Sequence, residues 1–255
     1  MSSPTHSEPT TSGGPPASER KVNTTVHGAT TSPPELAREL FASIAPTYER
    51  WARVLSMGQD ARWRRAMVDG LGLSPGSRVL DVAAGTGSIT RLMESCGLDV
   101  LAVDQSLEMT QMAKPRDGAV IVATAERLPF ADGTFDGVAF GYLLRYVDDV
   151  SGCLDELVRI VRPGGMVGMV EFGRPRGPWR PAWWLYTRAL LPVAGAVIRS
   201  GWWEVGRFLG PSIDAFAGEY PPDRLAGKWR AAGMEDVRFR RMSLGGGLVM
   251  WGRRR

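Results

Sequence analysis

The stretch RVLDVAAGTG (residues 78–87) decides the fold of this 255-residue chain. Residues 78–82 are typical of a buried strand, and Gly85 and Gly87 follow at once in a tight turn. Glycine at such positions lets the backbone approach a ligand closely, and the start of the next helix offers free N–H groups. The stretch therefore predicts a strand, a ligand-binding turn and a helix, in that order.

The chemistry of this turn favours a cationic ligand over a dinucleotide. A dinucleotide-binding turn has the pattern G-x-G-x-x-G, whereas Thr90 stands at the third glycine position here. Asp81 opens the turn, and its carboxylate is badly placed for a pyrophosphate but suits the amino group and sulfonium of S-adenosylmethionine. Asp104 ends the next predicted strand, where a carboxylate accepts hydrogen bonds from both ribose hydroxyls. The alternative, an ordinary strand-helix turn, fits this combination less well.

Strands and helices alternate along most of the chain. Short apolar runs that predict further strands lie at 100–103, 120–122, 137–140 and 167–170. Alternation of this kind predicts an α/β fold, a doubly wound, mostly parallel Rossmann-like sheet of about seven strands.

Helical spacing and chain-breaking residues mark the remaining elements. One helix is expected at 59–69 and another at 148–161, with Asp148 or Asp149 as its cap and Pro163-Gly164-Gly165 as its stop. A helix at 222–232 is followed by runs at 237–242 and 248–251, which predict an antiparallel C-terminal hairpin.

Composition divides the chain into parts. Residues 1–34 contain 22 Ser, Thr, Pro or Gly residues and no apolar run, which predicts a disordered tail and neither a signal peptide nor a membrane anchor. One folded domain is expected over 35–255. Within it, residues 174–217 interrupt the alternation and hold five of the nine tryptophans, which predicts a helical insertion, rich in Trp and Arg, that acts as a lid over the carboxyl edge of the sheet. Its uncharged run at 189–198 is too short to cross a bilayer, which takes roughly 20 residues.

Two scarce residue types exclude several kinds of chemistry. The only histidines, His6 and His27, lie in the tail, which excludes a histidine base, a Ser-His-Asp triad and the usual His-rich metal sites from the folded part. The two cysteines, Cys96 and Cys153, cannot form a disulfide framework or a structural zinc site. We expect no metal and a reducing, cytoplasmic location.

Positive charge is concentrated in two segments. The formal net charge is +4, but residues 174–207 hold six arginines against one glutamate, and residues 224–255 hold nine Lys or Arg against two acids. Such segments attract nucleic acid, anionic lipid or acidic substrates, and charge alone does not choose among them. Tryptophan and arginine together in the insertion fit contact with an anionic membrane surface. The alternative is that these tryptophans pack inside the insertion.

Seven motifs outline a known family. They are DVAAGTG (81–87), FASIAPTYERW (41–51), LSMGQDARWRR (55–65), AERLPFADGTFD (125–136), VRPGG (161–165), EFGRP (171–175) and FLGPSI (208–213). With them the chain resembles, from Phe41 to Gly252, class I S-adenosylmethionine methyltransferases and more narrowly the C-methyltransferases of menaquinone and ubiquinone biosynthesis. The resemblance implies methylation of a prenylated naphthoquinol, as in demethylmenaquinone to menaquinone. It also implies a lipid-quinol partner at the inner membrane face and no nucleic acid.

The resemblance implies a role for each matching residue. Asp81, Gly85 and Gly87 would hold the methionine end of the cofactor, Asp104 its ribose, and Thr124, Ala125 and Glu126 its adenine. Tyr48 and Arg64 would close over the cofactor, while Arg145 would face the acceptor ring. Further cofactor contacts are expected from Ala83, Thr86, Gln105 and Tyr142. Thr124 stands where the family usually has Asp or Asn. Leu143, Tyr146 and Gly206 also depart from the family pattern, so the acceptor side is altered more than the cofactor side.

Methylation of a ring carbon needs a phenolate, whose ortho carbon attacks the methyl group. A guanidinium is a poor base because its pKa exceeds about 12. We therefore assign Arg145 to stabilising the phenolate and Tyr48 or a water to relaying the proton. The alternative for Arg145 is a surface ion pair with Asp148 or Asp149.

Three other functions remain open at the sequence level. The acceptor could be a soluble aromatic metabolite, methylated on oxygen or carbon. A nucleic-acid methyltransferase would also be basic, but residues 141–143 read Gly-Tyr-Leu where amino-group methylation of bases uses an Asn/Asp-Pro-Pro-aromatic stretch, and Cys153 fits a buried helix face better than base chemistry. The third is a cofactor-binding subunit without activity. The oligomeric state is not indicated.

Overall fold

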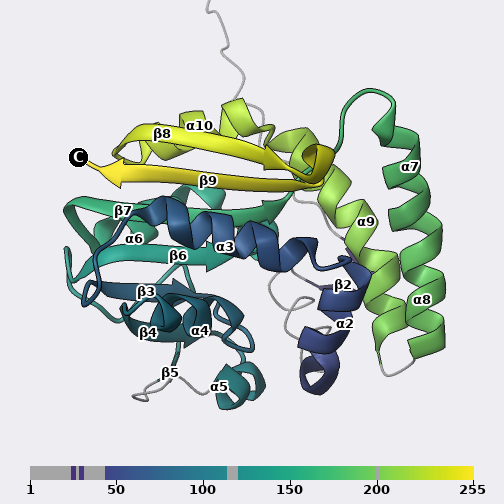
Figure 1. Cartoon of the computed structure of the whole chain (residues 1–255), viewed down its shortest axis with the longest axis horizontal. Coiled ribbons are helices and arrows are strands. Elements are labelled where there is room, and N and C mark those ends of the chain that lie inside the picture. The colour runs from purple at the N-terminus through teal and green to yellow at the C-terminus, as the bar shows by residue number, and fades with distance from the viewer. Residues whose placement is uncertain (1–23, 27–28, 32–43, 114–119, 199–200) are drawn as a thin grey trace, which may run out of the picture.

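Seven strands form one sheet in the order β5-β4-β3-β6-β7-β9-β8 (Figure 1). The computed structural model describes residues 24–26, 29–31, 44–113, 120–198 and 201–255. The strands are β3 (Arg78–Val82), β4 (Asp99–Asp104), β5 (Val120–Val122), β6 (Phe135–Gly141), β7 (Val161–Phe172), β8 (Met234–Met242) and β9 (Gly247–Arg254). Strands from β5 to β7 pair in parallel, whereas β9 pairs antiparallel with β7 and β8. The predicted fold class is confirmed.

Helices cover both faces of the sheet, because each presents an apolar stripe to it. They are α3 (Gln59–Leu71) and α4 (Ser88–Ser95) on one face, and α6 (Val150–Arg159) and α10 (Pro222–Ala231) on the other. Trp63 and Met93 belong to the first buried cluster, together with Val79 of β3. Leu154 and Trp229 belong to the second. Cys153 is buried in that second cluster, as its place on an apolar helix face predicts.

The segment around Pro163 differs from the prediction. Helix α6 is capped by Asp149, whose side chain accepts from the Ser151 N–H over 2.9 Å, but it ends at Arg159. Strand β7 begins at Val161, so Pro163-Gly164-Gly165 lie inside a strand and do not stop the helix. The pairing of β6 with β7 shifts register there. Since a bulge of this kind is defined only by the partner strand, the local sequence did not reveal it.

The insertion is helical, with α7 (Trp179–Leu185), a π-helical turn η3 (Tyr186–Leu190), α8 (Leu191–Ile198) and α9 (Trp202–Glu219). The π turn comes directly before Pro192, which has no backbone N–H to donate, so a wider turn is accommodated there. Figure 1 shows α7 and α8 in line, with α9 returning beside them, outside one end of the strands. This helical character agrees with the expectation for 174–217.

The remaining elements are short. They are β1 (Thr24–Val26), β2 (Ala29–Thr31), η1 (Ala45–Thr47), α2 (Tyr48–Leu55), α5 (Leu107–Ala113), η2 (Leu144–Tyr146) and η4 (Ser243–Gly245). Strands β1 and β2 pair antiparallel, which differs from the expectation of a tail without regular structure. The rest of residues 1–34 lies outside the described residues. Among those described, no helix is long and apolar enough to span a membrane.

Candidate active site

The turn after β3 uses its two glycines for different purposes. Gly87 has φ +79°, and a Cβ there would come within 2.5 Å of the Ala113 carbonyl oxygen, so only glycine fits. Gly85 has φ +57°, and a Cβ there would meet nothing within 4 Å. Ala83 also adopts a positive φ of 56°. Gly87 therefore lets the turn pack on the end of α5, while Gly85 leaves open space on the side of a cavity.

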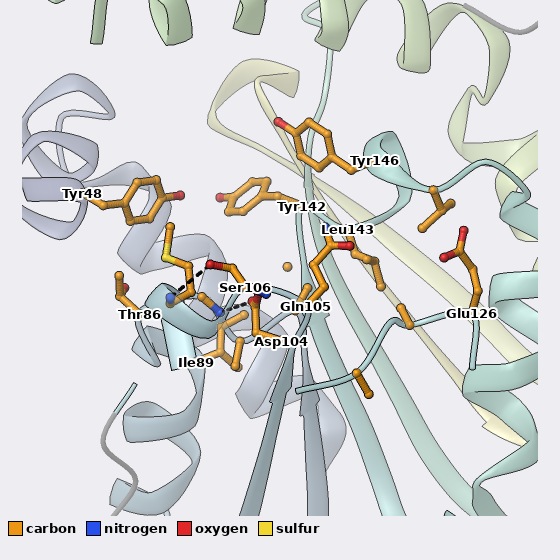
Figure 2. A pocket seen from close by; sticks show the side chains of 18 of the residues that line it. Tyr48, Thr86, Ile89, Asp104, Gln105, Ser106, Glu126, Tyr142, Leu143 and Tyr146 are labelled. Carbon is orange, nitrogen blue, oxygen red and sulfur yellow. Dashed lines mark hydrogen bonds between the residues drawn. The ribbon is translucent and has the colours of Figure 1, made fainter. Parts of the chain in front are cut away.

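Asp104 at the end of β4 is held by the turn and by its own strand end. Its Oδ2 accepts the Gly85 N–H over 2.8 Å, and its Oδ1 accepts the Ser106 N–H over 2.9 Å. Burial raises the pKa of this carboxyl, because the side chain is nearly enclosed. Figure 2 shows Asp104 at the floor of the cavity with its hydrogen bonds drawn. The carboxylate is thus fixed in place before any ligand arrives.

Asp81 is fully buried, and its carboxyl group has a raised pKa. Its Oδ2 accepts the Thr90 hydroxyl over 2.6 Å, while Oδ1 has no hydrogen-bond partner among the described residues. Burial raises the pKa of this carboxyl to about 7. A buried carboxylate oxygen without a partner favours a cation nearby. Asp81 does not line the cavity described next, so its charge would act on the positive methionine end of S-adenosylmethionine from behind the cavity wall.

The cavity over this turn has a volume of about 140 Å³. Ten of the predicted site residues line it, namely Tyr48, Arg64, Ala83, Gly85, Thr86, Asp104, Gln105, Ala125, Glu126 and Tyr142 (Figure 2). Asp81, Gly87 and Thr124 do not. Thr124 is exposed, and its neighbours Ala123 and Ala125 form the wall, so the expected contact of its hydroxyl with adenine is not supported.

Sequence reasoning missed part of this wall. The missed residues are Ala84, Ile89, Ser106, Met109, Ala123, Gly141, Leu143, Tyr146 and Val147. Ser106 follows Asp104 by two residues and could have been found from the strand end. Ala84 lies in the turn itself, and Ala123 and Gly141 lie at strand ends, so these could have been found in the same way. The rest reach the cavity only through the packing of α4, α5 and the segment around η2.

A second cavity of about 90 Å³ lies between α2, α3 and the insertion helices. Its wall is mostly apolar and includes Trp183, Leu191 and Leu209 of the insertion. Tyr48 and Tyr142 line this cavity as well as the first one, so the two compartments meet at these rings. We name them the cofactor cavity and the acceptor cavity, after the roles that the sequence predicts for Asp104 in the first and Arg145 in the second.

Asp60 organises the junction between the two cavities. Its Oδ1 accepts the Arg64 Nε–H over 2.9 Å and also the Tyr142 hydroxyl. The Arg64 guanidinium lies 5.6 Å from the centre of the Tyr142 ring. Burial raises the pKa of the Tyr48 and Tyr142 hydroxyls, so both stay protonated at neutral pH. The junction therefore presents hydroxyl groups that can pass a proton but do not carry a standing negative charge.

Arg145 lines the acceptor cavity and is buried, which corrects the alternative of a surface pair with Asp148 or Asp149. Its Nε donates to Glu171 Oε1 over 2.9 Å, and its Nη1 donates to Ser212 Oγ over 3.2 Å. Burial alone would lower the pKa of this guanidinium, but the charge and hydrogen bond of Glu171, together with the nearby Tyr146 and Tyr142, outweigh burial and raise the pKa. Arg145 is therefore a permanent cation in an apolar compartment.

Glu171 was quoted within a motif but given no role from the sequence. Its Oε1 accepts the Phe172 N–H over 2.7 Å in addition to Arg145, while Oε2 has no hydrogen-bond partner in the described part of the chain. Burial raises the pKa of this carboxyl. The signal that could have found it is its position at the carboxyl end of a predicted buried strand.

Comparison with known proteins settles the family. The model of the ubiE/COQ5 methyltransferase family matches residues 30–253. The chain belongs to the ubiE/COQ5 methyltransferase family. The demethylmenaquinone methyltransferase of Renibacterium salmoninarum is 41% identical over 220 residues, which cover 85% of this chain and 90% of that protein. That of a Parafrankia species is 39% identical over 242 residues, with 85% and 92% covered.

Solved structures agree on the fold of this family member. A S-adenosylmethionine-dependent methyltransferase of Thermotoga maritima, described as a possible histamine N-methyltransferase, aligns with a TM-score of 0.59 at 20% identity over 86% of this chain and 99% of its own. The predicted resemblance and enzyme class are confirmed, as is S-adenosylmethionine as the cofactor.

In this ubiE/COQ5 family member, helix α2 is fastened to the cofactor turn. Glu49 Oε1 accepts the hydroxyls of Thr86 and Ser88, each over 2.9 Å, and pairs with Arg91. Partial burial alone would raise the pKa of the Glu49 carboxyl, but the hydrogen bonds from Thr86 and Ser88 and the charge of Arg91 outweigh burial and lower it. Tyr48 on the same helix is thereby positioned over the cofactor cavity.

No group of three or more His, Cys, Asp or Glu that could hold a metal ion occurs among the described residues.

Proposed function

We propose that this chain transfers a methyl group from S-adenosylmethionine to a ring carbon of a prenylated naphthoquinol, converting demethylmenaquinol to menaquinol. The observation that carries the proposal is the meeting of two cavities at Tyr48 and Tyr142, one that holds the Asp104 carboxylate and one that is mostly apolar with the buried Arg145. The names of the curated relatives support the acceptor.

The residues act mainly by position and charge. When bound, the cofactor supplies a methyl group on a sulfonium, and Asp104 together with the turn at Gly85 would hold it. Arg145 stabilises the phenolate that forms when a ring hydroxyl loses its proton, because a fixed cation in an apolar compartment acts on the developing charge with little screening. Glu171 and Ser212 keep the guanidinium in one orientation. Tyr48 relays the proton towards solvent.

The apolar wall of the acceptor cavity favours a ring with a hydrophobic tail. Insertion residues form one side of it, among them Trp183, Gly206 and Leu209. We therefore propose that residues 174–217 act as a lid over the acceptor within a methyltransferase domain that spans 35–255, and that residues 1–34 form a tail outside it.

The outer surface of the insertion supports contact with a membrane. Seven of its large apolar side chains are between 41% and 78% exposed, namely Trp179, Trp184, Leu185, Leu190, Val193, Val197 and Trp203. Trp202, which is 4% exposed, is instead buried between the insertion and the N-terminal helices, where it stacks on Tyr48. Exposed indoles beside arginines suit the interface of an anionic bilayer. We propose a peripheral location at the cytoplasmic face of the inner membrane.

The acceptor is tested with S-adenosylmethionine labelled in its methyl group. The purified protein is incubated separately with demethylmenaquinol in detergent, a water-soluble dihydroxynaphthalene and total RNA. Label in menaquinol alone supports the proposal. Faster labelling of the soluble naphthalene would point to a soluble aromatic metabolite, and label in RNA would overturn the acceptor class.

Membrane contact is tested by sedimentation with vesicles that contain phosphatidylglycerol. Replacing Trp184 and Val197 with Ser removes two of the most exposed apolar groups of the insertion and should weaken binding. The matched control replaces Leu107 and Val122 with Ser, because these are 56% and 53% exposed on other elements. Equal binding by both double variants would remove the membrane part of the proposal.

A further inference from the structure

A third cavity, of about 190 Å³, lies at the base of the insertion and belongs to neither compartment described above. It is formed where the segment 173–178 leaves β7, where α9 gives way to α10, and where the turn between β8 and β9 closes. Four of the residues that line it are arginines, namely Arg174, Arg176, Arg180 and Arg241, and none is Asp or Glu.

These four arginines are not neutralised by the protein. No ion pair involves them in the part of the chain that the structure describes, whereas Arg64, Arg145, Arg159 and Arg188 each have a carboxylate partner. Four like charges around one hollow repel one another, and an anion between them would offset that repulsion. The guanidinium fork also matches phosphate oxygens two at a time.

The backbone around the cavity is closely built. A Cβ on Gly173 would come within 2.3 Å of the Gly245 carbonyl oxygen, so the two segments can approach only because residue 173 is glycine. The Gly173 N–H donates to the Gly246 carbonyl over 2.9 Å and joins the same segments. The arginines therefore stand on backbone segments that are tied together, which reduces the cost of ordering them around a ligand.

We propose that this cavity is a binding site for a phosphate group, carried by an anionic lipid headgroup or by a soluble phosphate or diphosphate. The location of the cavity is compatible with either source of the phosphate group. Trp179, which is 52% exposed, is next to Arg180 at the start of α7, so a headgroup bound here would sit beside an exposed indole. Phe172 lines both this cavity and the acceptor cavity, so the bound anion would lie one ring away from the acceptor. The proposal does not depend on which ring is methylated.

The test uses the whole protein and calorimetry with inorganic phosphate and with pyrophosphate in a chloride buffer of low ionic strength. The triple variant Arg174→Gln, Arg180→Gln, Arg241→Gln should bind pyrophosphate at least about tenfold more weakly than the unaltered protein. The control is Arg65→Gln, Arg230→Gln, Arg255→Gln, which removes the same charge from exposed arginines on other elements. It should change the affinity by less than about twofold.

Competition separates the two sources of the phosphate. If vesicles with phosphatidylglycerol displace pyrophosphate from the protein, and vesicles of phosphatidylcholine alone do not, the site takes a lipid headgroup. If phosphatidylglycerol vesicles do not compete, it takes a soluble phosphate. The proposal is overturned if the unaltered protein binds neither pyrophosphate nor phosphatidylglycerol vesicles, or if both triple variants lose affinity equally.

Measurements of cofactor binding and of methylation distinguish a failure of this proposal from a failure of the proposed function. Both triple variants should bind S-adenosylmethionine and methylate a detergent-solubilised acceptor as the unaltered protein does, because none of the six arginines lines the cofactor or acceptor cavity. Loss of cofactor binding in the Arg174, Arg180 and Arg241 variant would indicate a damaged fold and would overturn the assignment of an independent site.

Discussion

Arg145 and Glu171 form an ion pair in which Nε lies 2.9 Å from Oε1, and their side chains are only 2% and 1% exposed. One partner follows β6 in η2 and the other ends β7, so the pairing of two parallel strands brings them together. A buried pair of this kind is a weak source of stability, because removing both charges from water is costly. Its effect is to fix a cation beside the acceptor cavity.

The first prediction concerns the role of this cation. Arg145→Lys keeps a positive charge but loses the fork that reaches Glu171 and Ser212 together, so kcat should fall by about a hundredfold or more. The affinity for S-adenosylmethionine, measured by calorimetry, should stay within about twofold. Arg162→Lys is the control, since that side chain is 61% exposed. Equal loss of kcat and cofactor affinity would contradict the role.

Arg145→Ala is expected to be a poorer probe of the same role. It would leave the Glu171 carboxylate buried without its partner, which costs about 3–5 kcal/mol of stability in comparable cases. Thermal unfolding of the Ala and Lys variants side by side separates the loss of fold from the loss of chemistry.

The second prediction is a fall in the free energy of unfolding as pH rises from 3.8 to about 7. The Asp81 carboxyl ionises near 3.8 in an unfolded chain and near 7 in the folded one, so in this window the folded state holds a proton that the unfolded state has released. The unfolding free energy therefore falls as pH rises through the window and levels off above it. A pKa difference of about 3 units, at about 1.4 kcal/mol per unit, limits this change in the free energy of unfolding to about 4 kcal/mol.

Asp81→Asn should remove most of that dependence, as measured by urea unfolding without cofactor at several pH values. Burial also raises the pKa of the Asp104 and Glu171 carboxyls, so a smaller slope of the same sign should remain. Asp69→Asn is the control on an exposed carboxyl. An unaltered slope in Asp81→Asn would show that this carboxyl is ionised throughout.

The third prediction compares two glycines of α9. A Cβ on Gly206 would come within 2.7 Å of the Leu191 carbonyl oxygen and 2.9 Å of the Pro192 Cα, so Gly206→Ala should push α9 away from α8 and cost about 1–3 kcal/mol. Gly218, on the same helix, has nothing within 4 Å of that position, and Gly218→Ala should stabilise the protein by about 0.5 kcal/mol. Because Gly206 lines the acceptor cavity, its variant alone should raise the KM for the acceptor.

The fourth prediction concerns Glu49. Glu49→Gln keeps the size of the side chain but weakens its bonds to the hydroxyls of Thr86 and Ser88 and its pair with Arg91. The Kd for S-adenosylmethionine should rise by about three- to tenfold, as expected when a partly exposed network loses its charge. Asp69→Asn should leave this Kd unchanged in the same titration.

The sequence was most informative where local pattern and tertiary role coincide. Strands Arg78–Val82 and Val120–Val122 lie where their apolar runs predict them, and the turn at Gly85 borders a cavity as its composition indicates. In these segments, short-range sterics and burial act on the same few residues. The apolar periodicity and the positions of the glycines are therefore sufficient to predict the strands and the turn.

The unpredicted features depend on partners far along the chain. Glu171 pairs with a residue 26 positions away, and Pro163 continues a strand because β6 supports a bulge there. Asp60 was quoted in a motif, but its position at the junction follows from its hydrogen bond with Tyr142, 82 residues away. No local periodicity encodes such contacts, because they arise only once the sheet and the insertion have packed.

Helix α2 is tied at both ends. Glu49 near its start is held by the cofactor turn, and the Leu55 carbonyl at its end accepts the hydroxyl of Tyr186 from the π turn of the insertion. The eight residues of α2 thus form a rigid link between the openings of the cofactor cavity and the acceptor cavity. If α2 moves to admit one substrate, it also weakens the closure of the other cavity. We therefore expect the methyl donor and the acceptor to bind in a compulsory order. In initial-rate kinetics, high concentrations of the second substrate should then inhibit the reaction through a dead-end complex.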